Sequence, residues 1–131
     1  MKHLDESRDL SILVVDDNHD QATITAMFLK MHGFKVVTRS NGRECMEATE
    51  ELKPDVIITD IDMPIMDGIT ACNLIREQDW GKHIAIIAIS GNIEKLTGNP
   101  IQLSCFDAHF LKPDQYDYLV NTIWKTVNAR N

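Results

Sequence analysis

The chain has 131 residues, of which 44% are hydrophobic, with 20 acidic against 13 basic side chains and a formal charge of −7. This length favours a single domain that buries a core without disulfides or a structural metal. The hydrophobic content excludes a disordered chain, and the acid excess argues against a binder of nucleic acids or anionic membranes. We therefore expect a globular domain with no direct nucleic-acid binding and no membrane attachment.

The cysteines and the N-terminus indicate a cytoplasmic protein. Cys45, Cys72 and Cys105 are odd in number and widely spaced, which favours free thiols in a reducing compartment over a disulfide framework. The first residues are polar and mixed in charge, unlike a secretory signal, and no apolar run approaches the ~20 residues that span a bilayer. We predict a polar N-terminal lead over residues 1–10 and one domain over residues 11–129, with no output domain in this chain.

The first half of the chain alternates between strand and helix patterns. The run SILVV (11–15) is apolar and rich in β-branched residues, and it ends abruptly at two aspartates. A helical repeat of apolar residues follows over 18–32, and FKVVTR (34–39) has the composition of a second strand. The next helix ends at Lys53-Pro54, and its inward face is predicted to consist of Cys45, Ala48, Thr49 and Leu52.

The second half continues the alternation with one weak element. A loop, IDMPIMDG, leads into a helix that is predicted to end near Asp79. The stretch 92–104 is a poor helix because a Gly-Asn-Pro run at 98–100 interrupts it, so we expect this helix to be short or mobile. The last helix is predicted to begin near Asp114. The predicted strands in this half cover residues 55–60, 83–90 and 107–113.

This order predicts an α/β fold in which a strand and a helix alternate five times. Strands that are apolar almost throughout are typical of a parallel sheet that is covered by helices on both faces. Right-handed crossover connections then leave few possible arrangements. The pattern favours a flavodoxin-like (βα)5 doubly wound parallel five-stranded sheet with strand order 2-1-3-4-5.

Polar side chains follow the predicted strands where ligands bind in such a sheet, at the carboxyl ends. Asp16 and Asp17 follow the first strand, Asp60 ends the third, Ser90 ends the fourth and Lys112 follows the fifth. Because the first and third strands are neighbours in the predicted order, the three carboxylates should share one shallow pocket. The hydroxyl and the ammonium should lie on its far side.

This set of groups predicts a site for phosphoryl transfer. Carboxylates so close together repel one another unless a cation lies between them, and Mg²⁺ suits a site with few carboxylates and a substrate phosphate. A lysine and a serine are suitable donors for phosphoryl oxygens. The sequence has neither a P-loop nor a GxGxxG motif, so a bound nucleotide is not indicated.

The segments that carry these residues resemble the receiver domain of two-component response regulators, including the chemotaxis regulators. The matching motifs are VVDDN, DVIITDIDMPIMDG, AISGN and FLKP, which occur in the family's order within about residues 11–129. The resemblance implies that Asp60 is the phosphoacceptor, which takes a phosphoryl group from a phosphohistidine. The implied partner is a histidine kinase or a histidine phosphotransfer protein, whereas the output remains unknown.

The resemblance also implies roles for the other residues. Mg²⁺ would be held by Asp17, by Asp16 largely through water, by Asp60 and by the backbone carbonyl of Asp62. Ser90 and Lys112 would hold the phosphoryl oxygens. In the family, the bond that corresponds to Lys112-Pro113 is commonly cis, which makes Pro113 a candidate cis-peptide position.

Two residues leave a choice of interpretation. The switch position, three residues before the lysine, is usually Tyr or Phe in the family and is His109 here. Its ring either is a tolerated planar replacement or titrates near neutral pH and couples the switch to proton activity. Asp62, near the expected path of a hydrolytic water, either contributes only its carbonyl or tunes the lifetime of the acyl phosphate.

Three assignments of function remain to be compared. The first is a receiver that catalyses only its own phosphorylation and dephosphorylation and is not otherwise an enzyme. The second is a receiver module excised from a hybrid histidine kinase or a multidomain regulator. The third is a phosphatase like the haloacid dehalogenases, which also use a strand-end Asp, a second Asp two residues later, Mg²⁺ and a Lys. Their nucleophile ends the first strand, whereas Asp60 ends the third, which disfavours this class.

Overall fold

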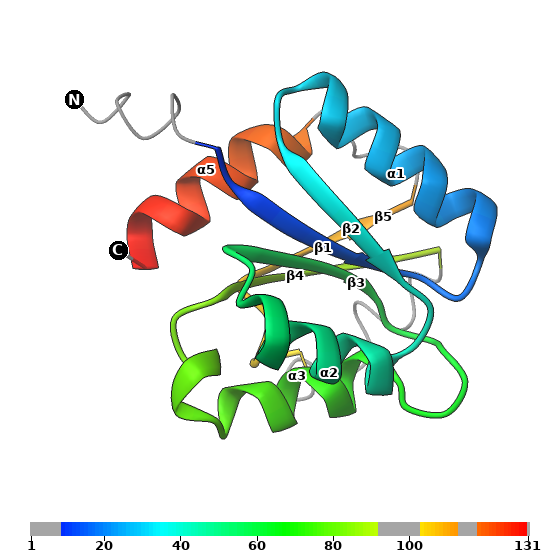
Figure 1. The fold of residues 1–131 in the computed structure, drawn as a ribbon, viewed down its shortest axis with the longest axis vertical. Helices are drawn as coiled ribbons and strands as arrows, with labels where there is room; N and C mark the ends of the chain where they lie inside the picture. Colours follow the sequence, from blue (N-terminus) through cyan, green and yellow to red (C-terminus); the bar gives the residue numbers. More distant parts are fainter. Residues whose placement is uncertain (1–8, 92–102, 113–117, 131) are drawn as a thin grey trace.

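The predicted strands form one parallel sheet. The computed structural model describes residues 9–91, 103–112 and 118–130. Its strands pair in the order β2-β1-β3-β4-β5, which confirms the predicted topology (Figure 1). β3 and β4 are buried along their whole length, whereas β2 and β5 form the partly exposed edges. The strands are β1 (Ser11–Val15), β2 (Lys35–Arg39), β3 (Val56–Asp60), β4 (Ala85–Ser90) and β5 (Ala108–Leu111).

The first three helices begin at capping residues that the chain supplies just after a strand or loop. The side chains of Asn18, Asn41 and Asp67 each accept a hydrogen bond from a backbone N–H three residues later, at 3.0, 2.9 and 2.7 Å. These bonds satisfy donors that the first helical turn leaves without partners. The helices are α1 (His19–Met31), α2 (Gly42–Leu52), α3 (Gly68–Arg76), a short 3₁₀ helix (Asp79–Gly81) and α5 (Leu119–Arg130).

Helices cover both faces of the sheet, as Figure 1 shows. Neighbouring residues of one strand point to opposite faces, so β1 contributes to two separate cores. Ile12 and Val14 belong to the core that includes residues of α1 and α5. Leu13 and Val15 belong to the core that includes residues of α2 and α3. The near-continuous apolar strands of the sequence are thus explained by burial on both sides.

Two helix predictions need correction. Leu52 is 45% exposed, because it is the last residue of α2 and the chain turns away at Lys53, which has a left-handed φ of 47°. α3 ends at Arg76 instead of near Asp79. The chain then folds back so closely that a Cβ at Gly81 would lie 2.0 Å from the Ile75 carbonyl oxygen. The expected weak helix at 92–104 and the start of the last helix fall largely outside the described residues.

Candidate functional site

The carboxyl ends of the strands bring the predicted polar residues to one edge of the sheet. Val15 of β1 pairs with Thr59 of β3, so the residues that follow them, Asp16 and Asp60, lie side by side. Farther along this edge, the backbone N–H of Lys112 donates to the Ser90 carbonyl at 2.9 Å and joins the ends of β4 and β5. Parallel pairing therefore gathers side chains that are up to 96 residues apart in sequence.

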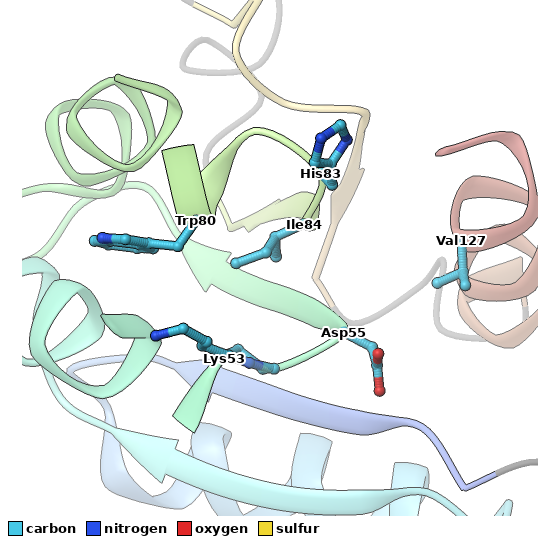
Figure 2. Close-up of a pocket in the computed structure, with 7 residues that line it drawn as sticks. Lys53, Asp55, Trp80, His83, Ile84 and Val127 are labelled. Carbon is cyan, nitrogen blue, oxygen red and sulfur yellow. The ribbon is translucent and has the colours of Figure 1, made fainter. Parts of the chain in front are cut away.

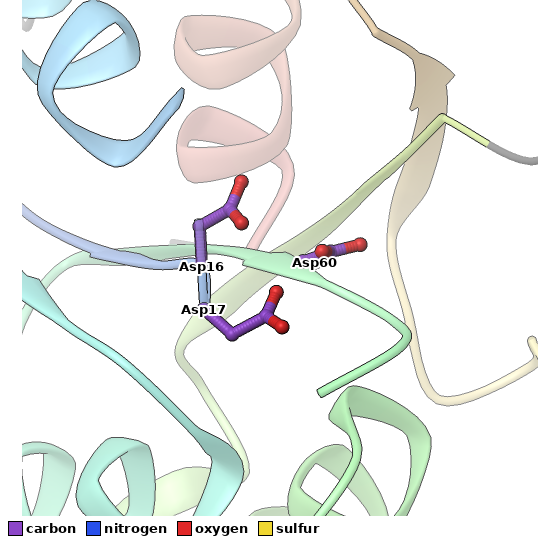
Figure 3. A group of neighbouring side chains, drawn as sticks. All are labelled: Asp16, Asp17 and Asp60. Carbon is purple, nitrogen blue, oxygen red and sulfur yellow. The ribbon is translucent and has the colours of Figure 1, made fainter. Parts of the chain in front are cut away.

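Three carboxylates form the centre of this edge. Asp16, Asp17 and Asp60 each offer a carboxylate oxygen, and these oxygens all lie within 4.8 Å of one another (Figure 3). Asp16 and Asp60 are 5% and 9% exposed, whereas Asp17 is open to solvent. An all-oxygen donor set with one open side fits a hard divalent cation such as Mg²⁺, which keeps several waters. The described residues therefore fit the predicted magnesium site.

Lys112 contacts two of these carboxylates directly. Its Nζ lies 2.5 Å from Asp16 Oδ2 and 3.4 Å from Asp60 Oδ2, and its side chain is 14% exposed. The sequence predicts this ammonium on the far side of the pocket, where it would bind phosphoryl oxygens. In the structure it pairs with Asp16 and Asp60, so the cluster has a protein cation of its own.

Burial and neighbouring charges together set the protonation of Asp60 and Lys112. Burial raises the pKa of Asp60 to about 6, with the negative charge of Asp16 adding to the rise and Lys112 opposing it. Burial also acts to lower the pKa of Lys112, but its hydrogen bond to Asp16 and the charge of Asp60 outweigh burial and raise that pKa overall. Lys112 is therefore charged at neutral pH, and Asp60 is mostly ionised there.

The raised pKa of Asp60 predicts a loss of stability as pH rises. An aspartate that holds its proton more tightly when folded stabilises the protein below its unfolded pKa, and that stability is lost as pH rises from about 4 to 6. In EDTA, the free energy of unfolding should therefore fall by roughly 2–3 kcal/mol more in wild type than in Asp60→Asn between pH 4 and pH 7.5. Urea unfolding at both pH values measures this difference, and parallel profiles would contradict it.

Two glycines, Gly42 and Gly68, anchor the loop after β3, and neither was predicted from the sequence as a residue of the site. The Gly68 N–H donates to the Ile61 carbonyl at 2.8 Å, and the Gly42 N–H donates to the Met66 carbonyl at 2.8 Å. A Cβ at Gly68 would lie 2.2 Å from the Asp60 carbonyl oxygen. The start of α3 thus packs directly on the backbone of Asp60, and the signal in the sequence is the glycine that follows the capping Asp67.

Gly68→Ala is expected to destabilise the protein because the clash is with backbone atoms that cannot rotate away. The free energy of unfolding should fall by about 1–3 kcal/mol. Gly91→Ala is a matched control, since a Cβ at Gly91 meets no heavy atom of the described residues within 4 Å. Urea unfolding of both variants measures the effect, and equal stabilities would show that the loop adapts.

Three of the remaining predicted residues are in the described part of the chain. The side chain of Asp62 is exposed just beyond Asp60, and Ser90 is 2% exposed at the end of β4. His109 of β5 pairs with Ala88 of β4 and is exposed to solvent. The candidate cis-peptide residue, Pro113, falls outside the described residues.

A cavity of about 220 Å³ lies at the opposite edge of the sheet (Figure 2). Asp55 precedes β3 and Ile84 precedes β4, so these lining residues mark the amino ends of the strands. The acidic cluster is at the carboxyl ends, so this cavity takes no part in the candidate site. The complete lining of the cavity is Lys53, Pro54, Asp55, Trp80, His83, Ile84 and Val127.

In the part of the chain that the structure describes, no helix is both long and apolar enough to cross a membrane.

Comparisons with known proteins bear on this site. Residues 12–123 match the response regulator receiver domain family. The chain is 35% identical over 118 residues to the chemotaxis protein CheY of Bacillus subtilis, with 89% of this chain and 97% of CheY covered. It is also 35% identical over 113 residues to the CAI-1 autoinducer sensor kinase/phosphatase CqsS of Vibrio cholerae. That match covers 86% of this chain but only 16% of CqsS.

Solved structures of receiver domains are also similar to this chain. The receiver domain of a sensor histidine kinase from Pseudomonas aeruginosa PAO1 superposes with a TM-score of 0.82 at 26% identity, and 92% of this chain and 99% of that chain are covered. The reported structure of that domain has a magnesium ion coordinated in its active site cleft. The response regulator domain of Thermotoga maritima CheB superposes with a TM-score of 0.79 at 28% identity, covering 92% and 98% of the two chains. The chain therefore belongs to the response regulator receiver domain family of two-component signalling systems.

Proposed function

We propose that residues 11–129 form a phosphorylation switch in which Asp60 accepts a phosphoryl group from the phosphohistidine of a histidine kinase or a histidine phosphotransfer protein. The observation that carries this proposal is the cluster of Asp16, Asp17 and Asp60, with carboxylate oxygens within 4.8 Å of one another and Lys112 beside two of them. Such a cluster destabilises the folded protein by charge repulsion, so a purely structural role does not explain it.

The transfer itself needs little covalent chemistry from the protein. A carboxylate oxygen of Asp60 forms the new O–P bond as the P–N bond to the partner's histidine breaks, and the histidine retains the bonding electrons. Asp16, Asp17, Asp60 and the backbone carbonyl of Asp62 would hold Mg²⁺, with Asp16 acting largely through water. When bound, Mg²⁺ would offset the negative charge of the phosphoryl oxygens and favour in-line transfer.

Lys112 and Ser90 would bind the oxygens of the transferred group. The ammonium lies 3.4 Å from Asp60, so it needs to exchange only its bond to Asp16 for one to the phosphoryl group. The Lys112 N–H is hydrogen-bonded to the Ser90 carbonyl, so movement at either residue is transmitted to the ends of both β4 and β5. Movement of β5 would then change the exposed surface at His109.

Incubation with Mg²⁺ and acetyl phosphate, followed by intact mass measurement, tests this function. Wild type should gain the mass of one phosphoryl group, and hydroxylamine, which cleaves acyl phosphates, should remove it. EDTA should prevent the gain. The same protein should not turn over p-nitrophenyl phosphate, whereas a phosphatase like the haloacid dehalogenases would. Absence of labelling at saturating donor and Mg²⁺ would overturn the proposal, and sustained hydrolysis would favour the phosphatase.

Asp62→Asn is expected to change the lifetime of the phosphorylated state several-fold. The exposed Asp62 carboxylate lies two residues after Asp60, where it orients or repels an attacking water. The amide keeps the size and the backbone carbonyl but removes the charge. The measurement is the decay of the phosphorylated mass species after the donor is removed. If the two half-lives agree, Asp62 contributes its backbone carbonyl alone.

The relatives also indicate the kinds of protein in which such a receiver domain functions. We infer that the chain acts in the cytoplasm, either as a single-domain regulator like CheY or as the receiver portion of a sensor kinase or a multidomain regulator. It spans 97% of CheY from Bacillus subtilis, 16% of CqsS and 36% of the transcriptional regulatory protein PrrA of Mycobacterium tuberculosis. The output that the phosphorylated surface controls therefore depends on which of these arrangements applies.

A further inference from the structure

Two cysteines that are distant in sequence meet beside β5. Cys72 lies on α3 and is 1% exposed, whereas Cys105 lies just before β5 and is half-buried. Cys72 belongs to the apolar core that α2 and α3 form against the sheet, and Cys105 packs against that core. The two thiols lie close enough for each to shift the pKa of the other. Tertiary packing has therefore brought two free cysteines together, one buried and one partly open to solvent.

Arg76 holds the segment around Cys105 in place. It lies one helical turn after Cys72, so both project from the same side of α3. Its Nε donates to the Cys105 carbonyl at 3.1 Å, and its guanidinium is 3.0 Å from Asp107. Asp107 in turn accepts a hydrogen bond from the Ile86 N–H at 2.9 Å, which attaches the same segment to β4. The approach of the two cysteines is thus set by a network of polar contacts.

The two thiols have different environments. The hydrogen bond from Cys72 lowers the pKa of Cys105, and the positive charge of Arg76 acts in the same direction, although partial burial and the negative charge of Asp107 oppose both. The hydrogen bond to Cys105 and burial raise the pKa of Cys72 well above its ordinary value. Thiolates, not thiols, attack peroxides. The accessible Cys105 is therefore the member of the pair suited to react first.

We propose that Cys72 and Cys105 form a peroxide-sensitive pair that closes to a reversible disulfide, a second covalent modification site of this receiver domain. The Cys105 thiolate attacks a hydroperoxide, the O–O bond breaks, and the leaving alkoxide or hydroxide takes a proton from solvent, so that the products are a sulfenic acid and an alcohol or water. The Cys72 thiol then attacks the sulfenic sulfur and gives up its proton, and the displaced hydroxide leaves with that proton as water while the S–S bond forms. The hydroperoxide is reduced by two electrons, and the two thiols are oxidised by two.

The bond would connect α3 to the segment that leads into β5. That strand carries His109 and is followed by Lys112, so oxidation would restrain the strand that links the acidic cluster to the surface. Cys72 and Cys105 are separate from the residues of the phosphorylation site, so oxidation of the pair can be measured whether or not Asp60 is phosphorylated.

Thiol counting after peroxide treatment of the full chain tests the pair. Reduced wild type is exposed to hydrogen peroxide while folded, and it is then unfolded in excess N-ethylmaleimide without reductant. Of the three cysteines, only Cys45 should remain alkylatable, and peptide mapping should show Cys72 joined to Cys105 within one chain. Dithiothreitol should restore all three. Three alkylated thiols, an intermolecular link or a link to Cys45 would overturn the proposal.

Three single variants serve as controls. Cys45→Ser should still form the bond, because Cys45 is buried on α2, where its Sγ is 4.0 Å from the Thr49 hydroxyl. Cys105→Ser should keep Cys72 fully reduced. Cys72→Ser should instead accumulate a sulfenic acid at Cys105, which dimedone traps. Circular dichroism verifies that each variant is folded, and the result with wild type stands without them. Dimedone labelling of Cys72 in place of Cys105 would contradict the assigned order of attack.

Discussion

Replacing Asp60 with asparagine is expected to abolish phosphorylation by acetyl phosphate. The amide oxygen can still accept the hydrogen bond that Asp60 Oδ1 receives from the Ile61 N–H at 2.7 Å, so the loop should keep its shape. The variant lacks the carboxylate that would attack phosphorus, and an amide is a poor nucleophile. The measurement is intact mass after incubation with donor and Mg²⁺, in which the variant should show no phosphoryl adduct.

Asp62→Asn is the matched control for this experiment. It removes one negative charge from the same loop, two residues away, but leaves the carboxylate of Asp60 in place. This variant should still gain one phosphoryl group, at a level that follows its own rate of dephosphorylation. Equal labelling of Asp60→Asn and wild type would show that a different residue accepts the phosphoryl group.

Lys112→Ala is expected to slow phosphorylation by about 100-fold while tightening the binding of Mg²⁺. The loss of rate follows from removing a charged donor that would bind the phosphoryl oxygens. The gain in Mg²⁺ affinity follows because Asp16 and Asp60, now within 2.5 and 3.4 Å of Nζ, would lose the cation that offsets their charge. Labelling rates and calorimetric titration with Mg²⁺ measure the two effects separately.

The opposite signs of these effects distinguish a specific role from general damage. A variant that merely unfolds would lose both labelling and Mg²⁺ binding. Lys125→Ala removes the same charge from an exposed position on α5 and should leave both quantities as in wild type. Weaker Mg²⁺ binding by Lys112→Ala, with the fold intact, would contradict the arrangement in which lysine and metal ion neutralise the same carboxylates.

The fold was predictable because its pattern is local and repeated. Strands such as β4, in which every residue is buried, require cover on both faces, and only a parallel sheet wrapped by helices supplies it. The predicted ends of the helices were less accurate. The end of α3 depended on Gly81 packing against Ile75, a contact that no periodicity in the sequence expresses. The exposure of Leu52 likewise depended on where α2 stopped.

The residues that form the site could be predicted from the sequence, but the contacts between them could not. Strand order alone brings Asp16, Asp17 and Asp60 together, since the carboxyl ends of neighbouring parallel strands share one edge. The choice of Lys112 between phosphoryl oxygens and carboxylates depends on side-chain rotamers and on the distance between β1 and β5. The close approach of Gly68 to the Asp60 backbone depends similarly on how the loop after β3 is packed.

The sequence by itself determined the alternating strands and helices, the strand order and the residues at the strand ends, because hydrophobic periodicity and chain connectivity are properties of neighbouring residues. Only the tertiary structure decided that Lys112 binds the acidic pair, that burial raises the pKa of Asp60 to about 6, and that Cys72 meets Cys105. These features arise from distances between side chains that are far apart in the chain. Their energies change steeply with distance and burial, which only the packed structure sets.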